Sequence, residues 1–181
     1  MKILAFAGSN SSTSINKKLV EYASSYFSED EVEILDLNNY EMPIYSSDRE
    51  SKGGIPQLAL DFAKKIDEND FLIISFAEHN GNYTVAFKNV YDWVSRIKNR
   101  PAFGNKPMLL MATSYGPHGG SSVLNIAKGS MPYAGGNVLE TFSLPVFSQN
   151  FNALTGIISE DHKKELEDKI QSVKADINKL V

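Results

Sequence analysis

The chain of 181 residues contains no cysteine. This absence excludes disulfide bonds, cysteine nucleophiles and thiolate metal sites, and it is compatible with a reducing compartment. No apolar run approaches the roughly 20 residues that a membrane-spanning helix needs. The N-terminus also lacks the basic segment and cleavage site of a signal peptide, because Lys2 leads directly into an apolar run. We therefore expect a cytoplasmic protein with no membrane partner.

The sequence also lacks a large excess of charge of either sign. The chain has 18 Lys and Arg against 22 Asp and Glu, a formal net charge of −4, and its basic residues are spread along the sequence. This pattern argues against nucleic acid or an anionic membrane as the main partner. The three histidines (His79, His118 and His162) lack the spacing of metal ligands, so we expect no metal site.

Short apolar runs alternate with helical patterns along the whole chain. Five runs are typical of buried strands, at residues 2–7, 32–37, 71–76, 107–113 and 137–142. Apolar spacing predicts helices from Ser14, from Pro56, over residues 87–97, from Ser121 and after Ser159. The last of these would bury Leu166, Ile170, Val173, Ile177 and Leu180. A polar loop is expected between the second strand and Pro56.

Five strands that alternate with five helices imply a parallel sheet covered on both faces. Ligands of such sheets bind beyond the carboxyl ends of the strands, near the point where the strand order reverses. By analogy with the flavodoxin-like order 2-1-3-4-5, the loops 8–16, 77–82 and 114–120 would lie together there. We therefore predict an α/β flavodoxin-like three-layer sandwich, with residues 1–181 forming a single domain.

The first loop carries five hydroxyl side chains and no lysine or arginine. Ser9, Ser11, Ser12, Thr13 and Ser14 precede a helix start, whose unpaired N–H groups and positive dipole end favour an anion. The loop has neither the Gly-Lys-Ser/Thr of a P-loop nor the G-x-G-x-x-G of a dinucleotide site. The pattern favours a small phosphate, that of FMN more readily than the triphosphate of ATP. The groups expected to hold it are Ser9, Ser11, Ser14, Asn16 and the N–H groups around Ile15. The alternative is a solvated turn whose last hydroxyl caps the helix.

The other two loops can face a flat ligand. Glu78, His79, Asn80 and Gly81 could present backbone groups to the polar edge of a heterocycle. The third loop offers Ser114 as a hydroxyl donor and has glycines at Gly116, Gly119 and Gly120 that allow a close approach. An ordinary polar connection is the alternative for each. Glu78 and His79 lack a third convergent group for acid–base chemistry, so a hydrogen-bonded surface pair is the simpler interpretation.

Three stretches together resemble the NADPH-dependent FMN reductase family of flavin, quinone, azo-dye and chromate reductases. They are Gly8-Ser9 through Ser14-Ile15-Asn16, Glu78-His79-Asn80, and Lys88 to Arg96. The resemblance implies a flavodoxin-like fold with the FMN phosphate at Ser9, Ser11, Ser14, Ile15 and Asn16. It places the isoalloxazine edge at Glu78, His79, Asn80 and Gly81, with Ser114 and Gly116 to Gly120 over the other side. The usual arginine, proline and tyrosine of the family fall here at Ser11, Ala77 and His79.

The resemblance implies an FMN-dependent NAD(P)H oxidoreductase that passes hydride to the flavin and on to a small acceptor by a ping-pong scheme. The acceptor could be a flavin, a quinone, an azo compound or a metal oxyanion, and no side chain has to act as catalyst because flavin N5 carries the chemistry. A flavodoxin-like electron carrier without turnover is the alternative, and a binding module without flavin is a third class. Both NADH and NADPH are open, with Arg49, Arg96 and Arg100 as candidates for a 2′-phosphate contact.

The resemblance also implies a homodimer or homotetramer, as is common in the family. Tyr91 and Trp93 lie on a predicted helix and have two interpretations. They are either packed against the helix's own neighbours or part of an aromatic subunit surface.

Overall fold

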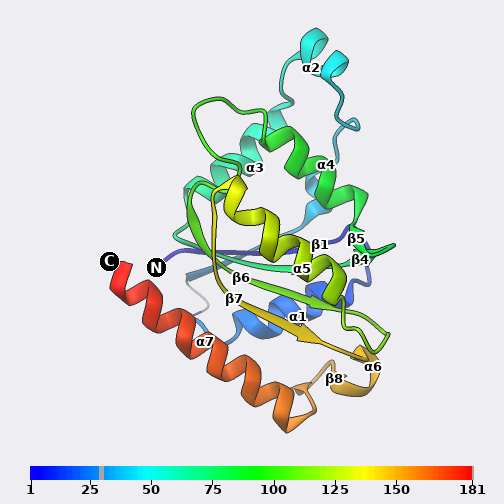
Figure 1. Cartoon of the computed structure of the whole chain (residues 1–181), viewed down its shortest axis with the longest axis vertical. Coiled ribbons are helices and arrows are strands. Elements are labelled where there is room, and N and C mark those ends of the chain that lie inside the picture. Colours follow the sequence, from blue (N-terminus) through cyan, green and yellow to red (C-terminus); the bar gives the residue numbers. More distant parts are fainter. Residues whose placement is uncertain (29–30, 181) are drawn as a thin grey trace.

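The computed structural model describes residues 1–28 and 31–180, and its centre is a parallel sheet between two layers of helices (Figure 1). The sheet strands are β1 (Ile3–Gly8), β2 (Val32–Leu35), β3 (Phe71–Phe76), β6 (Lys106–Thr113) and β7 (Gly136–Leu144). They are ordered β2-β1-β3-β6-β7, and all neighbouring pairs run parallel. Counted along the chain this order is 2-1-3-4-5, which confirms the predicted fold class.

Both faces of the sheet are covered because its strands are apolar on both sides. Helices α1 (Ile15–Ser24) and α7 (Glu160–Leu180) pack on one face, which includes Ile3 and Ile73. Helices α3 (Gln57–Asp67), α4 (Val85–Val94) and α5 (Ser121–Ser130) cover the face that includes Leu4 and Leu72 (Figure 1). Neighbouring residues of one strand thus enter opposite cores, as the pleat requires.

The final helix begins as the sequence predicts. Ser159 Oγ accepts a hydrogen bond from His162 N at 3.4 Å, and the stripe of Leu166, Ile170, Val173 and Ile177 is buried. The predicted fifth member of this stripe, the side chain of Leu180, lies outside the described residues.

Several short elements escaped the sequence patterns. Helix α2 (Ser47–Gly53) lies where a polar loop was expected, and it projects from the molecule (Figure 1). It buries none of its residues, so it has no apolar stripe that a sequence pattern could detect. The other additions have four residues or fewer: β4 (Glu78–His79), β5 (Asn82–Tyr83), η2 (Leu37–Tyr40), η3 (Met131–Ala134), α6 (Phe147–Asn150), β8 (Phe151–Asn152) and β9 (Gly156–Ile157).

The register of the sheet brings the predicted loops to one edge. Gly8 pairs with Phe76, and Phe76 pairs with Ala112, so β1, β3 and β6 end at the same level. This edge lies near β4 and β5 in Figure 1, away from the N- and C-terminal ends. Because the strand order reverses between β1 and β3, a ligand site is expected here.

Within the part of the chain that the structure describes, no helix combines the length and the apolar composition that a membrane span requires.

Candidate functional site

A cavity of about 270 Å³ opens at the carboxyl ends of the central strands. It is lined by residues that follow β1, β3 and β6: Ser9, Ser11, Thr13, Ser14, Ile15, Asn16, Ala77, Glu78, His79, Thr113, Ser114 and Tyr115. The structure thus brings together most of the residues that the sequence singled out. The exceptions, which are not among the lining residues, are Asn80, Gly81, Gly116, Gly119 and Gly120.

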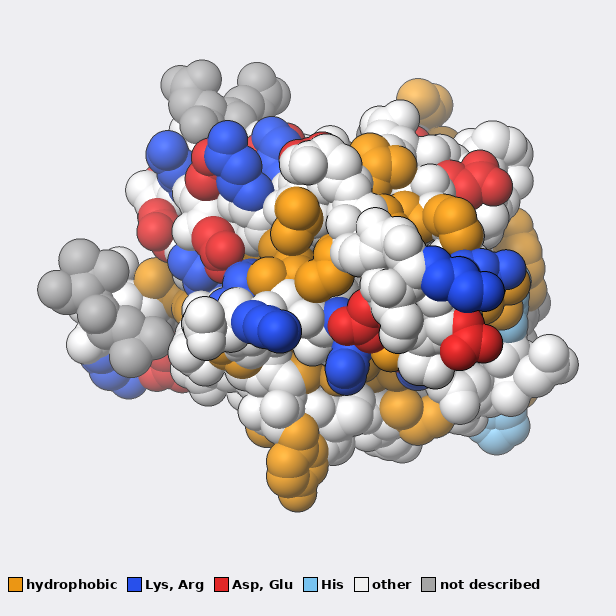
Figure 2. Space-filling view, turned by 90° about the horizontal axis from the view of Figure 1, so that it is seen from above, with side chains coloured by type: hydrophobic (Ala, Val, Ile, Leu, Met, Phe, Trp, Pro, Cys, Tyr) orange, Lys and Arg blue, Asp and Glu red, His pale blue; other side chains and the backbone are white. Residues whose placement is uncertain are grey.

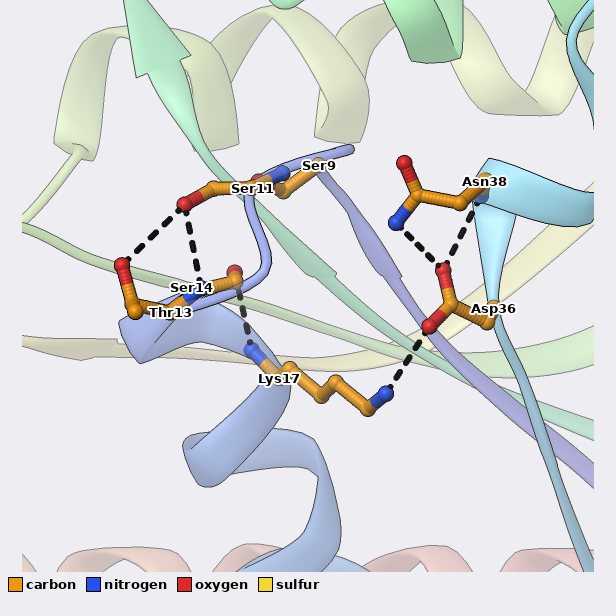
Figure 3. Close-up of polar contacts among 7 residues, drawn as sticks. All are labelled: Ser9, Ser11, Thr13, Ser14, Lys17, Asp36 and Asn38. Carbon is orange, nitrogen blue, oxygen red and sulfur yellow. Dashed lines mark hydrogen bonds and ion pairs between the residues drawn. The ribbon is translucent and has the colours of Figure 1, made fainter.

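The hydroxyl loop before α1 is ordered by its own side chains (Figure 3). Ser9 Oγ accepts from Ser11 N at 3.2 Å, and Ser11 Oγ accepts from Thr13 N at 3.3 Å. Ser14 Oγ caps the helix by accepting from Lys17 N at 3.2 Å. A hydroxyl that accepts a backbone N–H keeps its own hydrogen for another partner. The loop can therefore present hydroxyl donors to an anion while its backbone stays satisfied.

The first turn of α1 adds backbone donors to this wall. The N–H groups of Lys17 and Lys18 are bonded to Ser14, through its Oγ and its carbonyl oxygen. Among the described residues, the N–H groups of Ile15 and Asn16 have no acceptor. They lie at the positive end of the helix dipole, where an anion is stabilised.

The nearest lysine of this helix is directed elsewhere. Lys17 Nζ lies 3.0 Å from Asp36 Oδ2 and extends away from the serine loop (Figure 3). The backbone N–H of Asn38 and the ammonium of Lys17 lower the pKa of Asp36, and the hydrogen bond to Asp36 raises the pKa of Lys17. No lysine or arginine is among the described residues that line the cavity. An anion bound here would therefore be held by uncharged hydrogen-bond donors and by the dipole of α1.

Asn16 has a different role from the one predicted for its side chain. Its Oδ1 accepts from Ser75 Oγ at 2.7 Å and from Thr113 N at 3.0 Å, and its Nδ2 donates to Thr113 O at 3.2 Å. The residue is only 2% exposed. The amide thus ties α1 to the ends of β3 and β6, and only the backbone N–H of Asn16 remains for an anion.

The loop after β3 is a tight hairpin rather than an open connection. Asn80 and Gly81 have φ values of 53° and 74°, which the type I′ turn between β4 and β5 requires. The carboxylate of Glu78 accepts from Val123 N at 3.0 Å, at the start of α5. Gly81 is therefore required for the chain reversal, and its close approach to a ring stays a prediction. The predicted Glu78–His79 pair is replaced by the Glu78–Val123 bond.

The glycine-rich loop after β6 packs on the end of β7. Ser143 Oγ donates to Gly119 O at 3.0 Å, and Val146 N donates to Gly116 O at 3.0 Å. A Cβ at Gly119 would lie 2.4 Å from Ser143 Oγ and 2.9 Å from Pro145 N. The predicted close approach of Gly119 is thus made to protein, and Ser114 is the predicted residue of this loop that lines the cavity.

We expect Gly119→Ala to lower the free energy of unfolding by about 2–4 kcal/mol, because a side chain here meets backbone at a φ of +57°. Urea unfolding followed by circular dichroism measures the change. Gly116→Ala is the matched control, since its nearest contact would be Ser114 Oγ at 3.9 Å. Equal losses in the two variants would show that the contact with β7 is not decisive.

A sequence profile of the NADPH-dependent FMN reductase family matches residues 1–150. The chain belongs to this family. A 2-hydroxy-1,4-benzoquinone reductase from a Burkholderia species is 30% identical over 173 residues, which cover 92% of this chain and 91% of that protein. Membership confirms the resemblance drawn from the motifs and, with it, the predicted enzyme class.

Solved structures support the fold of this FMN reductase family member. The flavoenzyme NAD(P)H:(acceptor) oxidoreductase FerB from Paracoccus denitrificans matches with a TM-score of 0.79 at 21% identity, covering 98% of this chain and 97% of that one. An FMN-dependent NADH-azoreductase from Bacillus anthracis str. Ames Ancestor, in complex with FMN, matches with a TM-score of 0.60 at 12% identity, covering 99% of both chains. Likeness at such identities shows the fold alone.

A second cavity adjoins the first in this FMN reductase homologue and was missed by sequence reasoning. It has a volume of about 250 Å³ and is lined by Asn10, Leu37, Asn38, Tyr40, Glu41, Met42, Ile44, His79, Thr84, Val85, Ala86 and Asn89. Much of it comes from the segment after β2. Because β2 neighbours β1, its carboxyl end flanks the reversal of strand order, and this was the available signal. Thr113 in the first cavity was missed as well, whereas Thr13, Ala77 and Tyr115 lie in the predicted loops but had been assigned no contact with a ligand.

The aromatic residues of α4 in this family member are packing residues. Trp93 is 1% exposed, and its Nε1 donates to Pro43 O at 2.7 Å. Tyr91 packs against Phe103 with a ring separation of 5.3 Å. The packing interpretation is therefore correct for Trp93, and its interpretation as an aromatic subunit surface is wrong.

Charges of both signs are mixed on the face of the molecule seen in Figure 2. Lys and Arg side chains lie beside Asp and Glu side chains there rather than in a patch of one sign. Histidine side chains lie at the right-hand edge of this view, the side at which β4 and β5 lie in Figure 1. The described side chains on this face therefore form no basic stripe of the kind that binds nucleic acid.

Proposed function

We propose that residues 1–181 form one FMN-binding domain that transfers hydride from NAD(P)H to a small quinone-type acceptor. The observation that carries this proposal is the cavity at the reversal of strand order, where hydroxyl groups and the start of α1 converge. Family membership supports the cofactor and the reaction class.

The donor set of the first cavity fits the phosphate of FMN. Hydroxyls of Ser9, Ser11 and Ser14, together with the N–H groups of Ile15 and Asn16, would hold it by hydrogen bonds. The family's usual arginine falls at Ser11, and no other cation is among the lining residues. A monoester with one charged group suits neutral donors better than a triphosphate, whose several charges call for lysine or a metal ion.

The isoalloxazine edge is assigned to the other two walls. Glu78, His79 and Ser114 line the cavity there, and we propose that backbone N–H groups of residues 77–82 and 114–120 face the polar edge of the ring. Such donors would stabilise the negative charge that gathers on the ring upon reduction. Asn80, Gly81, Gly116, Gly119 and Gly120 would contribute by shaping these segments.

When bound, FMN supplies the redox chemistry, accepting hydride from NAD(P)H and delivering it to the acceptor. The second cavity would bind the nicotinamide and then the acceptor, since it meets the first cavity at His79. Two substrates that share one cavity must bind in turn, which gives a ping-pong scheme. A quinone-type acceptor is supported by the relative named as a 2-hydroxy-1,4-benzoquinone reductase.

The three arginines considered for a 2′-phosphate contact differ in their bonding partners. Arg96 pairs with Glu50 at 3.0 Å, and Arg100 pairs with Asp67 at 2.7 Å. Arg49 donates to the carbonyl of Ile44, a residue that lines the second cavity. We propose Arg49 as the residue able to contact a 2′-phosphate if NADPH is used.

The purified protein is expected to show a flavin absorption spectrum after incubation with FMN and to oxidise NADH or NADPH when 1,4-benzoquinone is supplied. The spectrum after removal of free FMN measures binding, and the absorbance of reduced nicotinamide measures turnover. Initial rates at several fixed quinone concentrations should give parallel double-reciprocal lines, as ping-pong kinetics requires.

Other outcomes would contradict the proposal in different ways. A flavin spectrum without consumption of either nicotinamide would indicate the flavodoxin-like electron carrier. A protein that stays colourless with FMN would indicate a binding module that retained only the fold.

Assembly and location extend the proposal. We propose a homodimer or homotetramer in the cytoplasm, as the family resemblance implies. Light scattering coupled to size-exclusion chromatography tests the first, since a mass near 20.0 kDa would show a monomer. Cell fractionation tests the second.

A further inference from the structure

His79 stands at the junction of the two cavities. Among the described residues, it is the one that lines both of them. It belongs to β4, where it pairs with Asn82 across the tight hairpin, and the hairpin is attached to α5 by the bond from Val123 N to Glu78. The imidazole is exposed, and no hydrogen bond to it is found in the described part of the chain. It is therefore positioned by its backbone and free to contact a ligand.

Four other groups with exchangeable protons lie around His79. Tyr40 and Glu41 line the second cavity after β2, while Glu78 and Tyr115 line the first. Burial raises the pKa of Tyr40, which makes it a poorer acid than an exposed tyrosine. The carboxylate of Glu78 is engaged with Val123 N. Imidazole is the side chain that ordinarily gains and loses a proton near neutral pH.

The reduction of a quinone needs such a donor. When a quinone accepts a hydride, the electron pair of the new bond displaces charge onto a carbonyl oxygen. That oxygen becomes a hydroxyl only when it also receives a proton. An acid with a pKa close to the working pH accelerates this kind of step.

We propose that His79 is the catalytic residue that protonates the oxygen of a quinone-type acceptor bound in the second cavity. This inference rests on the proposed function. NAD(P)H is oxidised to NAD(P)⁺ in the first half of the cycle and supplies the hydride by way of FMN. In the second half the hydride forms an O–H bond at one quinone oxygen, and an electron pair moves through the ring to the other oxygen. That oxygen forms the second O–H bond as the N–H bond of the His79 imidazolium breaks. The product is the hydroquinone, and the neutral imidazole recovers its proton from solvent because it is exposed.

The test compares two acceptors on the FMN-loaded protein. Benzoquinone needs a proton, whereas ferricyanide takes one electron and no proton. We expect His79→Gln to lower the ratio of the quinone rate to the ferricyanide rate by about 10–100-fold, since general acids commonly contribute 10²–10⁴-fold and water partly replaces an exposed one. His162→Gln, on α7 and away from both cavities, is the matched control and should leave the ratio unchanged.

Two further readouts separate an acid from a residue that only shapes the cavity. The quinone kcat/KM of the unaltered protein should fall as pH rises, because a general acid must carry its proton in order to donate it, and this pH dependence should vanish in His79→Gln. The NMR signals of the His79 imidazole should shift when hydroquinone is added to the FMN-loaded protein without nicotinamide.

Each remaining outcome overturns a specific statement. Equal losses with both acceptors, an unchanged ratio, or a hydroquinone titration that leaves the imidazole signals in place would overturn the role of His79. If the unaltered protein reduces ferricyanide with neither NADH nor NADPH, the proposed function fails, and the proton-donor role fails with it.

Discussion

Replacing Ser14 with glutamate is expected to weaken FMN binding more than about a hundredfold, because a carboxylate would face the phosphate. Two unit charges 4 Å apart near a protein surface repel by about 4 kcal/mol, which exceeds the ~2.7 kcal/mol of a hundredfold change. Ser14 caps α1 and lines the cavity, so the new charge enters the donor cluster itself. Titration of the apoprotein with FMN, followed by quenching of flavin fluorescence, gives the dissociation constant.

Two controls separate charge from damage to the helix. Ser14→Ala removes the cap without adding charge, and it should cost about 1 kcal/mol of stability with a much smaller loss of FMN affinity. Ser46 caps α2 in the same way but lines neither cavity, so Ser46→Glu should leave FMN affinity unchanged. If Ser14→Glu retains FMN as tightly as the unaltered protein, the loop is only a helix cap.

Asn16→Ala is expected to lower the free energy of unfolding by about 3–5 kcal/mol, since each buried polar group left without a partner costs about 1–3 kcal/mol. The substitution removes the partner of Ser75 Oγ and of both backbone groups of Thr113. Ser75 and Thr113 are 0% and 1% exposed, so water cannot easily replace the amide. Urea unfolding measures the loss.

The same variant should also bind FMN more weakly. The Asn16 amide holds α1 against β3 and β6, so its loss should displace the loop that precedes α1. Asn178→Ala is the comparison, as this asparagine is exposed on α7 and should change stability by less than about 0.5 kcal/mol. A stable Asn16→Ala protein would mean that the three hydrogen bonds do not position the site.

Ser14 and Asn16 lie two positions apart in the same motif but use their side chains differently. Ser14 keeps a hydrogen for a ligand while its oxygen caps the helix. The side-chain amide of Asn16 bonds to Ser75 and Thr113, so only its backbone N–H is available to a ligand. Sequence reasoning assigned both residues to the phosphate, because residue type reports what a group can bond and not which partner lies nearest.

The strand and helix pattern was largely predictable from local chemistry. Buried parallel strands are apolar runs, and the helices that cover them carry stripes at helical spacing, so both appear in the sequence. Helix α2 was not predictable in this way, since it buries none of its residues. The Asn80–Gly81 turn has a recognisable signal, but its flanking strands are only two residues long.

The sequence by itself determined the fold class, the family and the neutral, hydroxyl-rich character of the loop before α1. These depend on residue types and on spacings within short segments, which local chemistry dictates. Only the tertiary structure decided that Asn16 bonds to Thr113, that Gly119 packs on β7, and that His79 joins two cavities. Each of these depends on segments that are distant along the chain and meet through sheet order and register. These long-range contacts decide which hydrogen-bond donors face a ligand and which are bonded within the protein.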